Sequence, residues 1–251
     1  MKNLFALALL SSSVATAAQP QGQSLVYNIG AQAFEGYRVG SGKKGSVLVV
    51  HDWMGLTERT KAKADAFAEL GYTVFAVDVF GRGVRPASAD AARENSVQYY
   101  KNHTLLRERV AAGLNQLQKI APNKNTAAVG YCFGGTSVIE LARSGAELKA
   151  IVSFHGGLDS PAPSDGKNIK ARVLALHGAD DPYVSAANLL AFEDEMRTHK
   201  IDWQLIKFGG AVHSFTDRSA GNDNSKGAAY NERADKRSWQ AMKSFLEESF
   251  Q

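Results

Sequence analysis

The sequence is poor in cysteine. Among its 251 residues there is one, Cys132. A lone thiol excludes an intramolecular disulfide as a source of stability. An unpaired thiol is also open to oxidation, so its presence is easier to understand if the sulfur has a chemical function.

The sequence also lacks the patterns that bind metals and nucleic acids. No two of its six histidines combine tight metal-ligand spacing with neighbouring carboxylates, so no metal site is expected. The formal net charge is +4, but no dense run of lysine and arginine with interleaved aromatic residues occurs. Binding to nucleic acid therefore has little support.

Long apolar runs are absent, apart from a short one near the start of the chain. Lys2 precedes an apolar stretch over 4–10, and Ala15-Thr16-Ala17 matches an A-x-A cleavage site. The stretch is too short to span a bilayer. We therefore predict a signal peptide over 1–17 and an exported mature protein, periplasmic or secreted, without a membrane-spanning segment.

Internal repeats and interdomain linkers are absent as well, which favours a single domain over 18–251. Continuous apolar runs that predict buried strands alternate with segments of helical spacing, and this alternation predicts a mostly parallel sheet with helices on both faces. The expected strands are 24–29, 33–39, 47–50, 73–79, 126–131, 149–154, 172–176 and 203–208, the first two forming an edge hairpin. The expected helices are 59–70, 87–119 with a break near 102–104, 136–143, 186–198 and 227–248.

The sequence is organised around the turn Gly-Tyr-Cys-Phe-Gly-Gly over 130–135, which joins a short apolar run to a run of helix formers. Strand, sharp turn and helix, with a reactive side chain at the apex, is the nucleophile elbow of the α/β-hydrolases. Glycines flank the apex because a Cβ there would clash with the backbone. Cys132 would lie at the helix N-terminus, where the helix dipole favours the thiolate. The alternative is a small buried hydrophobe at a strand end, the usual fate of a free cysteine.

Two loops in the second half of the chain carry candidate partners for Cys132. The loop after the expected strand 172–176 contains Asp180 and Asp181, and the loop after the next strand contains His213. The chain order nucleophile, acid, histidine is that of the α/β-hydrolases. We expect His213 to exchange a proton with the thiol, and one of the two aspartates to orient the imidazole.

The other histidines have ordinary explanations. His155 and His177 follow strands and are expected to hydrogen-bond within the core or to line the cleft. His103 and His199 lie on helical stretches and are expected to be solvated.

A developing oxyanion needs two backbone N–H donors. One is expected from Phe133, directly after the nucleophile, and the other from Trp53, in the loop that follows the first main strand. Asp52, beside Trp53, either bonds to the resting thiol or caps its own loop.

Together these motifs resemble the dienelactone hydrolase family over nearly the whole mature chain. The resemblance rests on the Gly-x-Cys-x-Gly-Gly turn at 130–135, Gly-x-x-Asp at 178–181, Gly-x-x-His-Ser-Phe at 210–215 and the acidic-aromatic loop at 51–56. It implies an α/β-hydrolase fold and a hydrolase with a cysteine nucleophile. It also implies that Asp181, rather than Asp180, is the acid, and that Asp52 is the counterpart of a family glutamate that interacts with the resting thiol.

The resulting interpretation is a hydrolase of small carboxylic esters or lactones that needs no cofactor. Cys132 would form an acyl-enzyme, and His213, oriented by Asp181, would activate water to release the acid. The alternative is a binding protein that keeps the fold without turnover, although a binder has no need of all three groups. A haloacid-type dehalogenase would normally have an aspartate at the elbow.

Several aromatic residues near these motifs are candidates for an apolar substrate pocket, although each could equally belong to the core. We expect Tyr131 and Phe215, together with Asp52, to contact the substrate or the thiol. The other aromatic candidates are Trp53, Phe80 and Phe133.

Overall fold

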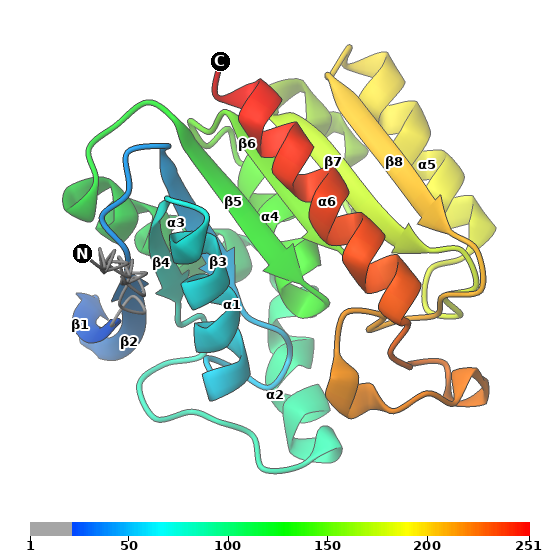
Figure 1. The fold of residues 1–251 in the computed structure, drawn as a ribbon, viewed down its shortest axis with the longest axis horizontal. Helices are drawn as coiled ribbons and strands as arrows, with labels where there is room; N and C mark the ends of the chain where they lie inside the picture. Colours follow the sequence, from blue (N-terminus) through cyan, green and yellow to red (C-terminus); the bar gives the residue numbers. More distant parts are fainter. Residues whose placement is uncertain (1–21) are drawn as a thin grey trace, which may run out of the picture.

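The computed structural model of the chain describes residues 22–251, and the signal peptide predicted over 1–17 lies outside the described residues. A sheet of eight strands, in the order β1-β2-β4-β3-β5-β6-β7-β8, runs through the described part (Figure 1). The strands are β1 Gln23–Ile29, β2 Gln32–Val39, β3 Ser46–Val50, β4 Thr73–Val77, β5 Thr126–Tyr131, β6 Ala150–Phe154, β7 Arg172–Gly178 and β8 Trp203–Phe208.

The strands from β4 to β8 in this order are parallel, and the β1–β2 hairpin adds to the β4 edge in antiparallel fashion. The central strands β3, β4, β5 and β6 are buried along their whole length. This burial explains why their sequences are continuous apolar runs rather than alternating ones. The predicted α/β-hydrolase arrangement, with its edge hairpin, is confirmed.

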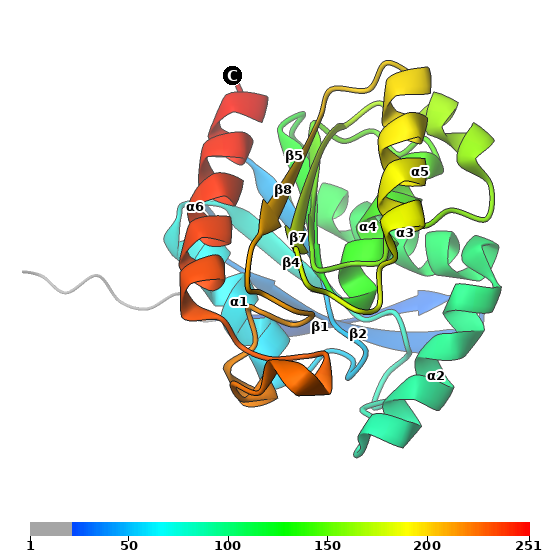
Figure 2. The ribbon, with the colours of Figure 1, turned by 90° about the vertical axis from the view of Figure 1, so that its right-hand side faces the viewer.

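Helices cover both faces of the sheet. They are α1 Glu58–Glu69, α2 Ala89–Lys101, α3 His103–Ile120, α4 Phe133–Arg143, α5 Ala186–Thr198 and α6 Glu232–Ser249. Figure 2 shows α1 and α6 on one side of the sheet and α3, α4 and α5 on the other. Among residues 22–251, no helix combines the length and the apolarity that a membrane crossing requires.

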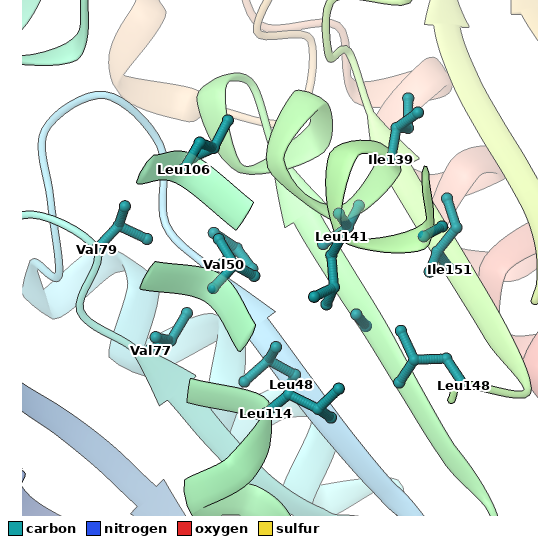
Figure 3. Packing of buried hydrophobic residues seen from close by; sticks show 14 of the residues in the cluster. Leu48, Val50, Val77, Val79, Leu106, Leu114, Ile139, Leu141, Leu148 and Ile151 are labelled. Carbon is teal, nitrogen blue, oxygen red and sulfur yellow. The ribbon is translucent and has the colours of Figure 1, made fainter. Parts of the chain in front are cut away.

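Each face of the sheet carries its own apolar core. On the α3 side, Val50 and Val77 of the sheet pack in one cluster with Leu106 and Leu114 of the helix (Figure 3). The helix comes close to the sheet at Gly113, where a Cβ would lie 2.2 Å from the Cγ2 atom of Val77. This contact fixes α3 and, packed beside it, α4, the helix that follows the predicted nucleophile.

Two helix boundaries show how single side chains set element ends. The predicted break in the long helical region occurs at Asn102, whose side chain accepts the N–H of Leu105 and caps α3. The closing helix, expected from 227, begins instead at Glu232. Asn231 caps it by accepting the N–H of Ala234, and short 3₁₀ turns occupy part of the segment before it.

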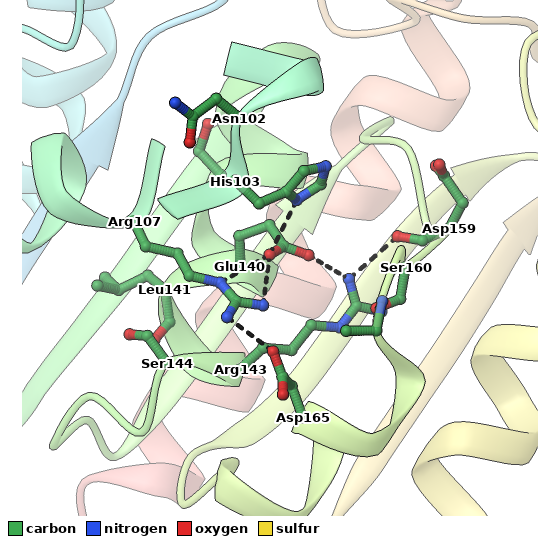
Figure 4. Close-up of polar contacts among 12 residues, drawn as sticks. Asn102, His103, Arg107, Glu140, Leu141, Arg143, Ser144, Asp159, Ser160 and Asp165 are labelled. Carbon is green, nitrogen blue, oxygen red and sulfur yellow. Dashed lines mark hydrogen bonds and ion pairs between the residues drawn. The ribbon is translucent and has the colours of Figure 1, made fainter. Parts of the chain in front are cut away.

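A buried ionic cluster is centred on two residues of α4, Glu140 and Arg143 (Figure 4). Arg143 of α4 is fully buried and donates to Glu195 of α5 at 2.9 Å through Nε and to Glu140 at 2.7 Å. It also donates to the carbonyl oxygen of Asp159, at 3.0 Å. Arg143 therefore ties α4 both to α5 and to the loop that follows β6.

The same cluster reaches α3 through Glu140. Arg107 of α3 donates from Nε to Glu140 at 2.9 Å and from Nη1 to Asp165 at 2.7 Å. His103 was expected to be solvated, but its side chain is only 18% exposed and its Nδ1 atom lies 3.0 Å from Glu140. The expectation failed because the helical pattern does not reveal a buried carboxylate on the neighbouring helix.

Candidate active site

The turn between β5 and α4 holds Cys132 at its apex with φ 54° and ψ −116°. A non-glycine residue in this region of backbone space is strained, and such strain clusters at functional sites. A Cβ on Gly130 would lie 1.9 Å from the carbonyl oxygen of Gly134, and one on Gly134 would lie 2.2 Å from that of Val50. Close backbone contacts at Gly130 and Gly134 therefore explain why the elbow needs glycine at both positions, as predicted.

The structure brings Cys132, His213 and Asp181 together. The Nε2 atom of His213 lies 3.1 Å from the Cys132 sulfur, and its Nδ1 atom lies 2.8 Å from Oδ2 of Asp181. Asp181 is buried and also accepts the N–H of Tyr183 at 2.9 Å. Asp180 is exposed and accepts the N–H of Gly210 in the neighbouring loop, so it shapes that loop and does not contact the imidazole.

Electrostatics favour a charged imidazole at this position. Burial alone would lower the pKa of His213, but the Cys132 sulfur and the Asp181 carboxylate raise the pKa to about 10. The imidazolium therefore faces the sulfur on one side and a carboxylate on the other. A protonated ring at this position can donate from Nε2 toward the sulfur and from Nδ1 to the carboxylate.

The loop after β3 is fixed by a histidine that sequence reasoning gave no role. The Nε2 atom of the buried His51 accepts the N–H of Val79 at 3.1 Å, so Nδ1 carries the proton and donates to the carbonyl oxygen of Asp52 at 2.6 Å. The Asp52 carboxylate accepts the N–H of Met54 at 2.7 Å. The Trp53 peptide between these residues is thereby held in place, and Trp53 lines the same hollow as Cys132.

The two expected oxyanion donors have no competing partners. Within residues 22–251, the backbone N–H groups of Trp53 and Phe133 donate no hydrogen bond. Phe133 is the first residue of α4, whose leading N–H groups have no partner inside the helix. The side chain of Phe133 is buried in the core.

The sulfur faces two hollows. One, of about 290 Å³, lies toward α1 and is lined by Cys132 together with Asp52, Trp53, Lys63 and Tyr131, among others. The other, of about 490 Å³, lies toward α2, and its lining includes Cys132, Trp53, Val97, Tyr100, Tyr183 and His213. Asp52 and Tyr131, expected to contact the substrate or the thiol, line the same hollow as Cys132, and the Asp52 carboxylate bonds to its own loop.

Phe215 does not lie where a substrate contact was expected. Its ring is fully buried and lines neither hollow. It packs edge-on against His155 at 5.1 Å between ring centroids, and Phe208 lies on it at 5.4 Å. The chain turns at Ser214, with φ 56°, and the Phe215 ring is buried in the core while His213 faces the sulfur.

A second imidazole, that of His155, packs against the ring of His213. His155 follows β6 with φ 40°, and its ring meets that of His213 edge-on at 5.3 Å. Its Nε2 atom lies 2.8 Å from Oγ1 of Thr216. Burial keeps the pKa of His155 well below its ordinary value, so the ring is neutral. His155 was expected either to hydrogen-bond within the core or to line the cleft, and it does both. His177 is likewise buried, at the end of β7.

A strained cysteine between a parallel strand and a helix, with an acid after β7 and a histidine after β8, defines the α/β-hydrolase class. The model of the dienelactone hydrolase family matches residues 32–250. The chain belongs to this family and is a hydrolase of the kind that acts on esters or lactones.

Individual relatives agree with the family. An uncharacterized protein of Caenorhabditis elegans is 34% identical over 58% of this chain and 94% of its own length. The carboxymethylenebutenolidase homolog of Homo sapiens is 26% identical over 69% and 71%. Among solved structures, P91, a dienelactone hydrolase-like promiscuous phosphotriesterase from metagenomic libraries, is 37% identical with a TM-score of 0.86, covering 92% of this chain and 99% of its own.

Proposed function

We propose that the chain hydrolyses small carboxylic esters or lactones through a Cys132–His213–Asp181 triad and a thioester intermediate. The observation that carries the proposal is the unbroken series of contacts from the sulfur, through both ring nitrogens of His213, to the Asp181 carboxylate. The name of the family and that of its carboxymethylenebutenolidase relatives support esters and lactones as substrates.

In the acylation step, the Cys132 thiolate attacks the carbonyl carbon and a C–S bond forms. The negative charge moves to the carbonyl oxygen, which accepts hydrogen bonds from the backbone N–H groups of Trp53 and Phe133. Collapse of this intermediate breaks the C–O bond of the ester. The leaving oxygen takes the proton from the His213 imidazolium, which leaves a thioester on the sulfur and a neutral ring.

In the deacylation step, water attacks the thioester carbonyl and gives a proton to the neutral His213. The C–S bond then breaks, the acid departs, and the thiolate and imidazolium are restored. Asp181 holds the ring in the tautomer that accepts this proton on Nε2. One ester and one water thus yield one acid and one alcohol.

Activated esters test the mechanism. Cys132→Ala should abolish turnover of para-nitrophenyl acetate, and His213→Ala should nearly abolish it. The control is His199→Ala, at a half-buried histidine that follows α5, and it should keep wild-type rates. Acid quenching during turnover should leave the acyl mass on the peptide that contains Cys132. Unchanged turnover in Cys132→Ala would reject the triad. A wild-type protein that binds esters without hydrolysing them would favour the non-catalytic binding protein.

A further inference from the structure

One cation in the α1 hollow has no partner. Lys63 of α1 projects into the cleft with its ammonium 3.8 Å from the centroid of the Tyr131 ring. Among residues 22–251, this ammonium has no carboxylate within 4.0 Å and donates no hydrogen bond. A lysine ammonium carries three donors, and an aromatic face offers charge stabilisation without satisfying them.

The three carboxylates whose charges act on Lys63 have other hydrogen-bond or ion-pair partners. Asp217 pairs with Arg59, which also donates to Ser219 at 2.7 Å. Asp52 accepts the N–H of Met54, and Asp235 accepts the hydroxyl of Tyr230 at 3.2 Å. Burial lowers the pKa of Lys63, and these three carboxylates only partly offset it. The unpaired cation is therefore a feature of the cleft and not half of an internal ion pair.

Lys63 also joins the cleft to a larger space. It lines the hollow that contains Cys132 and an adjoining hollow of about 710 Å³ that extends along α1 to Trp239 of α6. Together the two hollows are large enough to hold a ligand much larger than a compact lactone. An extended chain attached at the sulfur would pass the ammonium of Lys63.

The position of His213 decides which part of the ester faces Lys63. The leaving oxygen takes its proton from this imidazole, so the alcohol part must lie on the imidazole side. His213 lines the α2 hollow and is absent from the lining of the α1 hollow. In the α2 hollow the half-exposed side chains of Val97 and Tyr100 and the exposed ring of Tyr183 offer an apolar surface. The acyl group therefore extends toward Lys63.

We propose that Lys63 binds an anionic group at the far end of the acyl chain, so that the preferred substrates are monoesters of dicarboxylic acids with an apolar alcohol part. This inference rests on the proposed function, because it assigns the acyl part and the alcohol part of the ester to the two sides of the same site. The carboxylate of the substrate supplies the hydrogen-bond acceptor that the ammonium of Lys63 lacks.

A matched pair of esters tests the inference. Mono-para-nitrophenyl adipate and para-nitrophenyl hexanoate share leaving group and chain length but differ in the terminal carboxylate. Lys63→Met should lower the ratio of kcat/KM for adipate over hexanoate by about 10- to 100-fold, and Lys63→Arg should restore much of it. The control Lys61→Met, on the same helix and paired with Glu58, should leave the ratio unchanged. Added salt should lower the wild-type ratio.

Binding without turnover separates this inference from the proposed function. Free adipate should protect the Cys132 thiol of the wild type from iodoacetamide and should protect Lys63→Met much less. If hexanoate is hydrolysed but the ester ratio and the protection are the same in wild type and Lys63→Met, the subsite is wrong and the hydrolase stands. If neither ester is hydrolysed but protection depends on Lys63, the subsite stands and the proposed hydrolysis fails. The absence of both turnover and protection overturns both.

Discussion

The Nε2 atom of His213 lies 3.1 Å from the sulfur of Cys132, although 81 residues separate them in the sequence. The contact joins the turn after β5 to the loop after β8, and both leave the sheet at the same edge because the strands are parallel. The pair is thus positioned by the sheet as a whole, and its chemistry can be altered by substitutions that leave the fold intact.

The Asp181 carboxylate should be needed for chemistry rather than for substrate binding. Asp181→Asn keeps an acceptor for the Tyr183 N–H but can present an amide N–H to the ring, which disturbs its tautomer. We expect kcat to fall on the order of 10⁴-fold with little change in KM. Asp180→Asn, at an exposed carboxylate, is the control and should keep the wild-type kcat. Equal losses in the two variants in steady-state assays would contradict the assignment.

The titration of His213 should appear in the stability of the protein. Burial would lower the pKa of His213, yet the Cys132 sulfur and Asp181 raise it from 6.5 to about 10. Because the folded-state pKa is raised, the protonated ring stabilises the fold fully below about pH 6.5, and this contribution is lost as the pH rises through about 10. Urea denaturation across this range should therefore show the advantage of wild type over His213→Gln shrinking. A difference that is independent of pH would refute it.

The elbow should not tolerate a methyl group at Gly130. A Cβ there would lie 1.9 Å from the carbonyl oxygen of Gly134, so Gly130→Ala should cost about 3 kcal/mol or more in the free energy of unfolding. Gly209→Ala is the matched control, because a Cβ at Gly209 meets nothing within 4 Å. It should change stability by no more than about 0.5 kcal/mol. Denaturant midpoints of the two variants provide the comparison, and similar midpoints would count against the close contact.

The buried cluster around Arg143 should be far more sensitive than a surface ion pair. Arg143→Met leaves Glu140 and Glu195 without their buried cation, and we expect a loss of about 3–5 kcal/mol in unfolding free energy. Adding Glu195→Gln should recover part of that loss. Arg197→Met, in an exposed pair on α5, should cost at most about 1 kcal/mol. Equal thermal shifts for the two single variants would show that the cluster is not stabilising.

Much of the fold was predictable because its signals are local. Buried strands such as β3 and β5 are continuous apolar runs. The elbow can be identified from Gly130, Cys132 and Gly134, which lie within five residues. The meeting of His213 with Cys132 followed from the rule that functional loops leave parallel strands at one edge. These features depend on the chain's own sequence and on general topology.

Features that depend on the opposing surface were not predictable in the same way. Lys63 is one of several polar residues on an ordinary amphipathic helix until Tyr131 and the cleft are placed beside it. The contact of His103 with Glu140 requires the packing of α3 against α4. Phe215 was assigned to the cleft from its closeness in sequence to His213, but the turn between them sends its ring into the core.

The connection of β5 to a loop that follows β8 has a consequence for how the protein is made. The cysteine is synthesised well before the histidine, and α6, which packs on β6 and β7, is later still. Until the segment after β8 has been made, Cys132 has no His213 ring beside it. The triad proposed above can therefore form only in chains that have been extended past β8 and correctly assembled, and nascent or truncated copies would lack it.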